Sequence, residues 1–314
     1  MLKDRLRTSA VLITIILGLL YLDGNHSTAG AEGLWLLPLL LFFALGTARD
    51  MAMLLRGSQR LISPRVTLFA TAIVTLSACL PLLWPLFGEV YPQDCPVGRL
   101  GWTVIGAVAA MFVVLISEMK VYGIGPAGTI ERTSHAVFVS LYAGLPMALL
   151  VSLRAMGSGN WGLAALITMI LVTKSTDAGA YFTGKAIGKH KLIPRLSPGK
   201  TKEGAIGGIV TATIVAYVCL RWLFPAVGGD GTPPSQVPAV AFLANPIWGA
   251  LVLGPLLALS GMIGDLAESL VKRDCEAKDS GNWLPGLGGV WDVTDSLIAA
   301  IAPAFLCFAA GVAG

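Results

Sequence analysis

The sequence is poor in charged residues: Asp, Glu, Lys and Arg make up only 13% of its 314 residues. A typical soluble domain has about 25%. Hydrophobic residues account for 55%, and the mean hydropathy is +0.76. This composition excludes a disordered chain, a fibrous chain and most soluble enzymes. It indicates a polytopic membrane protein in which one helical bundle uses the whole chain.

Several common motifs are also missing. The five cysteines are scattered without a CxxC pair, so a zinc site or a thioredoxin-like site has no support. Strands of alternating hydrophobicity are absent, which argues against an outer-membrane barrel. Gly199-Lys200-Thr201 does not complete a Walker A loop, because Pro194 stands where the first glycine is needed. No Rossmann fingerprint, HExxH or GxSxG motif occurs.

Apolar segments long enough to cross a bilayer, which takes about 20 residues, recur along the whole chain. Nine are found, at 6–22, 34–55, 66–87, 101–122, 135–153, 161–178, 205–224, 246–264 and 290–311. We therefore expect an all-α fold, a polytopic bundle of about nine transmembrane helices that forms one membrane domain over 1–314. Within it, we expect 1–160 to hold spans one to five and 161–314 to hold the catalytic helices and inner loops.

The basic residues predict the orientation, because the cytoplasmic flanks of membrane helices are enriched in Lys and Arg. With nine spans and the N-terminus inside, 19 of the 22 basic residues fall on the inner side, and only Arg99, Arg154 and Arg221 fall outside. We predict a cytoplasmic N-terminus, an external C-terminus and, by default, a bacterial inner membrane. A signal peptide cleaved near Ala29-Gly30-Ala31 is the alternative for the first segment.

Carboxylates gather near the end of the chain. Seven of the 18 lie in one stretch: Asp265, Glu268, Asp274, Glu276, Asp279, Asp292 and Asp295. On a helix continuing from the eighth segment, Asp265 and Glu268 share one face with Lys272. Asp292 and Asp295 stand three residues apart at the start of the ninth segment. Mg²⁺ prefers such oxygen ligands, so these residues predict a divalent-cation site; two ordinary solvated helix ends are the alternative.

A second polar loop, from about Lys174 to Gly204, is rich in glycine, hydroxyl and lysine residues. Backbone N–H groups and ammonium groups neutralise phosphate oxygens, so this composition suits a phosphate site. Ser197 or Thr201, followed by Glu203, suits a helix N-terminus, which also attracts anions. An ordinary basic inner loop is the alternative.

Residues 269–295 resemble the signature of the phosphatidate cytidylyltransferase (CDP-diacylglycerol synthase) family, S-x-x-K-R-x4-K-D-x-G/S/A-x2-L-P-x-H-G-G-x-x-D-R-x-D. Residues 197–204 resemble a second family motif, S-P-x-K-T-x-E-G. The chain departs from the signature at Leu287, where the family has His, and at Val293, where it has Arg. Loss of the Arg removes a bidentate phosphate donor.

The resemblance implies transfer of CMP from CTP to phosphatidic acid, giving CDP-diacylglycerol and pyrophosphate at the cytoplasmic face. The implied catalytic residues are Asp265, Asp292, Lys272, Arg273 and Asp295. The implied Mg²⁺ ligands are Asp265 and Asp292, with Glu268 in support. The implied phosphate-binding residues are Lys200, Thr201, Ser197, Lys278, Lys189, Asp177, Glu203, Gly288 and Gly289. A second, monovalent cation and a homodimer are left open, and no nucleic acid is expected.

Three alternatives remain at this point. A related membrane CTP-dependent transferase or a kinase would act on another lipid, such as an isoprenoid or archaeal-type lipid. A secondary transporter would use buried carboxylates for ion coupling, although charges at helix ends and in inner loops favour cytosolic chemistry. An inactive homologue is suggested by Leu287 and Val293.

Overall fold

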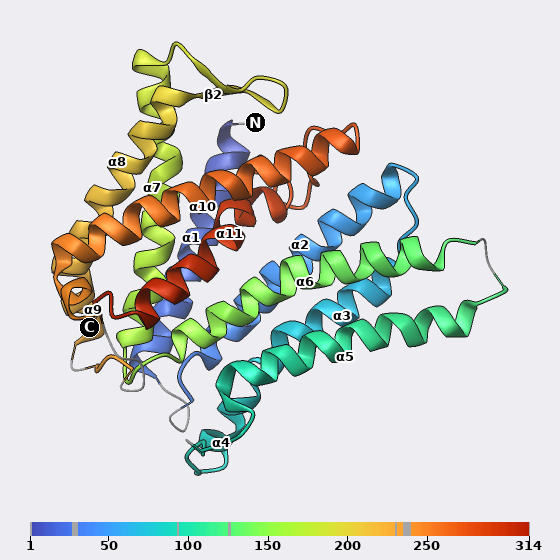
Figure 1. Ribbon diagram of the computed structural model, residues 1–314, viewed down its shortest axis with the longest axis horizontal. Coiled ribbons are helices and arrows are strands. Elements are labelled where there is room, and N and C mark those ends of the chain that lie inside the picture. The colour runs from blue at the N-terminus through green and yellow to red at the C-terminus, as the bar shows by residue number, and fades with distance from the viewer. Residues whose placement is uncertain are drawn as a thin grey trace. The chain divides into compact units, whose positions relative to one another are not determined.

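The computed structural model describes residues 2–26, 31–92, 94–124, 127–229, 231–234 and 240–313. These residues fold mainly into helices (Figure 1). Within the described residues, eight helices are long and apolar enough to cross a membrane, and one bent helix pair makes a ninth span if it is counted as one. The predicted all-α, polytopic membrane fold is therefore confirmed. Residues 29 and 30 of the considered cleavage site lie outside the described residues.

The first half of the chain forms the helical elements from α1 to α6. They are α1 (Leu2–Asn25), η1 (Leu34–Leu36), α2 (Leu37–Gly57), α3 (Pro64–Ser77), η2 (Leu80–Leu82), α4 (Leu83–Leu86), α5 (Gly98–Val121) and α6 (Thr129–Arg154). The chain bends by 48° between α3 and the segment that ends in α4. Pro81 and Pro85 lie in this region, and proline removes a backbone donor and disrupts a regular helix. The third predicted span is therefore a bent pair of helical segments rather than one continuous helix.

The second half supplies the remaining elements. They are α7 (Trp161–Ile187), β1 (Lys191–Ile193), β2 (Ser197–Thr201), α8 (Lys202–Val218), the π-helical turn η3 (Cys219–Leu223), α9 (Phe224–Gly228), η4 (Ala241–Ala244), α10 (Pro246–Asp274) and α11 (Trp291–Ala309). Two helices extend beyond their predicted spans: α7 ends at Ile187 rather than 178, and α10 ends at Asp274 rather than 264. Lys272 and Arg273 in the last turn of α10 favour this extension, because cations stabilise a helix C-terminus.

The polar loop predicted from Lys174 to Gly204 is partly wrong, because α7 continues through its first half. The rest contains an antiparallel hairpin in which Lys191 pairs with Thr201 and Ile193 with Ser197. The hairpin leads directly into α8, whose N-cap is Thr201: its Oγ1 accepts a hydrogen bond from the Gly204 backbone N–H at 3.1 Å. The predicted helix N-terminus is therefore confirmed at Thr201.

The chain divides into two compact units, which are described separately. The first unit comprises Met1–Ser152 and Asp274–Thr294, and the second comprises Leu153–Arg273 and Asp295–Gly314. In the first unit, α3, α5 and α6 share a buried core of Ala70, Val74, Ala110, Val114 and Ala136. In the second unit, α7 packs closely on α8 through small residues such as Gly179 and Gly207. The expected division at residue 160 stays a prediction.

Candidate active site

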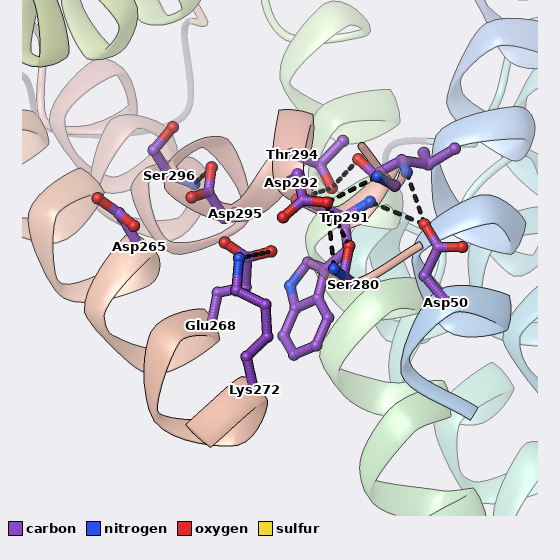
Figure 2. A network of polar contacts seen from close by, with 12 residues as sticks. Asp50, Asp265, Glu268, Lys272, Ser280, Trp291, Asp292, Thr294, Asp295 and Ser296 are labelled. Atoms are coloured by element: carbon purple, nitrogen blue, oxygen red, sulfur yellow. Dashed lines mark hydrogen bonds and ion pairs between the residues drawn. The ribbon is translucent and has the colours of Figure 1, made fainter. Parts of the chain in front are cut away.

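Three carboxylates of the second unit converge on one another (Figure 2). Asp265 and Glu268 project from α10 and Asp295 projects from α11, and one ligand oxygen of each lies within 4.8 Å of the others. The predicted shared face of Asp265 and Glu268 accounts for two of them. The close approach of α11 requires Gly264, because a side chain there would overlap the Asp295 backbone carbonyl. This carboxylate cluster (Asp265, Glu268 and Asp295) therefore depends on a glycine in the helix that bears two of its members.

The carboxylate cluster is largely withdrawn from solvent. Glu268 is 2% exposed and Asp295 is 8% exposed, whereas the side chain of Asp265 is 31% exposed. Buried carboxylates that face one another repel strongly unless cations compensate them. Oxygen ligands from three carboxylates fit a hard divalent cation such as Mg²⁺. The cluster therefore has the donor set that the predicted cofactor needs.

Three lysines of the second unit surround these carboxylates. The Lys272 ammonium lies 3.2 Å from Glu268 Oε1, one helical turn along α10. Lys200 at the end of β2 forms an ion pair with Asp265. Lys174 of α7 donates a hydrogen bond to Ser296 Oγ at 2.9 Å and interacts with the carboxylate of Asp295. Cations from three separate elements therefore compensate the cluster.

Lys174 and Ser296 are functional candidates that the sequence did not reveal. Lys174 stands at the start of the second polar loop and has no individual role predicted from the sequence, but α7 continues past it and its side chain reaches Ser296. Ser296 follows Asp295 and carries no motif of its own. Only the pairing of α7 with α11 relates the two residues, and no local sequence signal encodes that pairing.

A pocket of about 470 Å³ lies beside Asp265. Its walls come from α7, the hairpin, the start of α8 and α10. Its polar lining is formed by Asp177, Lys185, Lys200, Thr201 and Asp265. This volume is within the range of small-molecule sites. The pocket therefore brings three predicted phosphate-binding residues, Asp177, Lys200 and Thr201, together with the predicted metal ligand Asp265 in the second unit.

The predicted glycine pair organises a loop of the first unit. Asp292 Oδ2 accepts hydrogen bonds from the Gly289 backbone N–H at 2.6 Å and from Ser280 Oγ at 2.8 Å (Figure 2). Gly288 has φ +98°, a conformation that other residues adopt only with strain, and a side chain there would meet Asp292. Asp292, in the first turn of α11, thus holds the loop between Ser280 and Gly289 in place by hydrogen bonds. It belongs to the first unit and the carboxylate cluster to the second, so its role as a metal ligand stays a prediction.

Asp50 of α2 holds the same loop from the other side, a role that the sequence alone does not predict. Its side chain is 2% exposed, and its Oδ2 accepts the backbone N–H groups of Val290 at 2.6 Å and Trp291 at 3.2 Å (Figure 2). These N–H groups open α11, so Asp50 serves as an N-terminal cap supplied by another helix. Its partners are backbone groups 240 residues away, which is why no motif marks it.

The other predicted residues lie at the edges of these features. Arg273, Lys278 and Asp279 are exposed. Glu203 accepts the backbone N–H of Lys189 at 3.1 Å and therefore stabilises the entry to the hairpin. Ser197, Lys278, Lys189 and Glu203 keep their phosphate-binding roles, and Arg273 its catalytic role, only as predictions.

Fold and site together define a multi-pass α-helical membrane protein with a carboxylate cluster beside a lysine-lined pocket. The chain belongs to the cytidylyltransferase family, whose model matches residues 3–310. The family expected from the signature is therefore confirmed.

Individual relatives agree with this assignment. The chain is 42% identical over 165 residues to phosphatidate cytidylyltransferase of Brucella suis biovar 1 (strain 1330), covering 52% of this chain and 53% of that protein. It is 34% identical over 189 residues to phosphatidate cytidylyltransferase of Bacillus subtilis (strain 168), covering 60% and 63%. It is 37% identical over 147 residues to the uncharacterized protein YnbB of Escherichia coli (strain K12), covering 47% and 43%. The chain spans about half the length of the curated relatives that it matches first.

Proposed function

We propose that this protein is a phosphatidate cytidylyltransferase of a bacterial inner membrane, which forms CDP-diacylglycerol and pyrophosphate from CTP and phosphatidate. The observation that carries the proposal is the carboxylate cluster beside a pocket lined by Lys185 and Lys200. Membership of the cytidylyltransferase family supports nucleotidyl transfer over transport. The names of the Brucella and Bacillus relatives support phosphatidate as the acceptor.

The reaction needs charge compensation more than it needs a base. A phosphate oxygen of the lipid attacks the α-phosphorus of CTP, a new P–O bond forms, and the bond to pyrophosphate breaks. The attacking oxygen is already ionised near pH 7, so no activating side chain is required. The main obstacle is the approach of two polyanions, and positioning together with cationic groups lowers that barrier. A site rich in lysines and carboxylates meets this requirement.

Each group in the second unit has a part in that chemistry. Asp265, Glu268 and Asp295 would hold Mg²⁺, which when bound neutralises phosphate oxygens of CTP. Lys200 binds the triphosphate from the hairpin side, and its ion pair with Asp265 places it beside the carboxylate cluster. Lys272 compensates the buried charge of Glu268. We place this site on the cytoplasmic side, because the basic residues favour an N-terminus inside.

Replacing Lys200 by Gln is expected to raise the KM for CTP by about tenfold, with a smaller change in kcat, because one charge-assisted contact to phosphate is lost. The measurement is initial rate against CTP concentration at saturating phosphatidate. Lys191→Gln is the matched control, since Lys191 is an exposed lysine of the same hairpin and is not among the lining residues. Equal effects of the two substitutions would show that general loop charge, rather than Lys200, binds CTP.

The lipid acceptor is tested by competition. The purified protein in nanodiscs receives labelled CTP, Mg²⁺ and equimolar phosphatidate, polyprenyl phosphate, polyprenol and an archaeal-type ether lipid, and the labelled products are separated. CDP-diacylglycerol is expected as the main product. A dominant isoprenoid or ether-lipid product would assign the protein to the related transferases or kinases instead.

A further inference from the structure

An apolar groove of about 500 Å³ runs along α1 in the first unit. Val11, Ile15 and Leu19 form one wall, and Leu39 and Phe42 of α2 form the other. Val11 is 60% exposed and Ile15 is 49% exposed, so the groove opens sideways. In a membrane protein, a lateral apolar groove faces lipid hydrocarbon rather than water.

The dimensions of the groove fit a single chain of one leaflet. Its lining on α1 runs from Arg7 to Leu19, which is about 18 Å at 1.5 Å per residue. Half of a hydrocarbon core of about 30 Å is about 15 Å. The groove is therefore about 3 Å longer than the part of a phospholipid acyl chain that lies in one leaflet.

The polar lining residues of the groove lie at the N-terminal end of its α1 wall, and the loop of residues 284–289, part of the family signature, contributes Leu284 to the lining. Arg7 and Thr8 lie there together with Leu284. Thr8 Oγ1 donates a hydrogen bond to the Pro285 carbonyl at 2.8 Å, which fastens the loop to α1. A guanidinium at the end of an apolar track complements an anionic lipid phosphate, because arginine binds phosphate bidentately.

The loop connects this groove to Asp292. Leu284 forms a β-bridge with Gly288, and the adjacent Gly289 N–H donates to Asp292 Oδ2. A lipid lying in the groove with its phosphate beside Arg7 would have that phosphate next to the loop that carries the family signature. Backbone contacts of one loop thus link the lining of the groove, within one unit, to a predicted catalytic residue.

We propose that the groove between α1 and α2 binds one acyl chain of the phosphatidate substrate and presents its phosphate at Arg7 and the 284–289 loop. The proposal rests on the proposed function for the identity of the lipid. The N-terminal helix α1 would then take part in substrate binding, a role that none of the sequence motifs predicts.

Filling the groove tests the proposal. Val11→Trp combined with Ile15→Trp is expected to raise the KM for dioleoyl phosphatidate by about tenfold, with an unchanged KM for CTP. Ile13→Trp combined with Leu17→Trp is the matched control, because both residues are exposed on α1, have the same spacing and lie outside the lining. With dihexanoyl phosphatidate, whose chains are too short to fill the groove, both double variants are expected to match the unmodified protein. Equal KM values for dioleoyl phosphatidate in both double variants would overturn the proposal.

A binding measurement keeps the proposal separate from the enzymatic activity. Phosphatidate with a diazirine in its acyl chain is photolysed with the unmodified protein in nanodiscs, and the labelled peptides are mapped. Labelling is expected in 7–19 and 38–42, with competition by phosphatidate but not by phosphatidylcholine. Labelling elsewhere, or equal competition by both lipids, would overturn the groove assignment. Because this readout needs no turnover, a failure of the proposed function is recognised independently, as absence of CDP-diacylglycerol in the unmodified protein.

Discussion

Replacing Asp265 by Asn is expected to lower CDP-diacylglycerol formation by about 10³-fold at saturating substrates and Mg²⁺. Asp265 is the most exposed member of the carboxylate cluster and the one that lines the pocket. The substitution removes one negative ligand and leaves the Lys200 ammonium without its carboxylate partner. Initial rates with labelled CTP measure the loss. An intact melting transition confirms that the protein remains folded.

Asp274→Asn is the control for that experiment. Asp274 also lies on α10, at its exposed last residue, where it pairs with Arg60. Exposed ion pairs contribute little to stability, and this carboxylate is not a member of the cluster. Its substitution is expected to change the rate by less than about twofold. Near-normal activity of Asp265→Asn would show that the carboxylate cluster is not required for catalysis.

With Asp292 as the metal ligand predicted from the family signature, replacing Asp50 by Ala is expected to lower activity by about 10²-fold, an effect typical of a residue that orients such a ligand. The change leaves two buried N–H groups of Val290 and Trp291 without their acceptor, at a cost of about 1–3 kcal/mol for each unpaired group. The loop that places Asp292 then loosens. The measurements are kcat and the Mg²⁺ concentration for half-maximal activity, which is expected to rise.

Asp50→Asn distinguishes positioning from general stability. Asparagine keeps one carbonyl oxygen that can accept these N–H groups, so a partial recovery of kcat and of the Mg²⁺ dependence is expected. A purely structural role would lower the amount of folded enzyme and leave the Mg²⁺ half-saturation unchanged in the folded fraction. That second result would contradict the positioning role.

Local patterns predicted the features that local physics controls. Each of the nine apolar segments contains a described helix, and the break in the third, between Ser77 and Leu80, directly precedes Pro81. The i, i+3 spacing placed Asp265 and Glu268 on one face because helical geometry alone decides it. The cap at Thr201 followed from its hydroxyl, since a side-chain oxygen at that position satisfies a free backbone N–H.

Features that depend on contacts between residues far apart in the sequence could not be predicted. Lys174 meets Ser296 across α7 and α11, 122 residues apart in the chain, and hydropathy does not predict which helices lie together. Asp50 binds backbone groups, which carry no side-chain signature. The Lys191–Thr201 hairpin lacks the alternating pattern by which strands are recognised. In each case the sequence shows the residue but does not indicate which other residue it contacts.

Turnover by the purified protein tests whether it is a phosphatidate cytidylyltransferase. The protein in nanodiscs is given labelled CTP and phosphatidate, with Mg²⁺ or with excess chelator, and CDP-diacylglycerol and pyrophosphate are both quantified. Equal amounts of the two products are expected with Mg²⁺, and neither product is expected with chelator. Absence of both products from folded protein with Mg²⁺ would contradict the proposed activity and would favour the inactive homologue suggested by Leu287 and Val293.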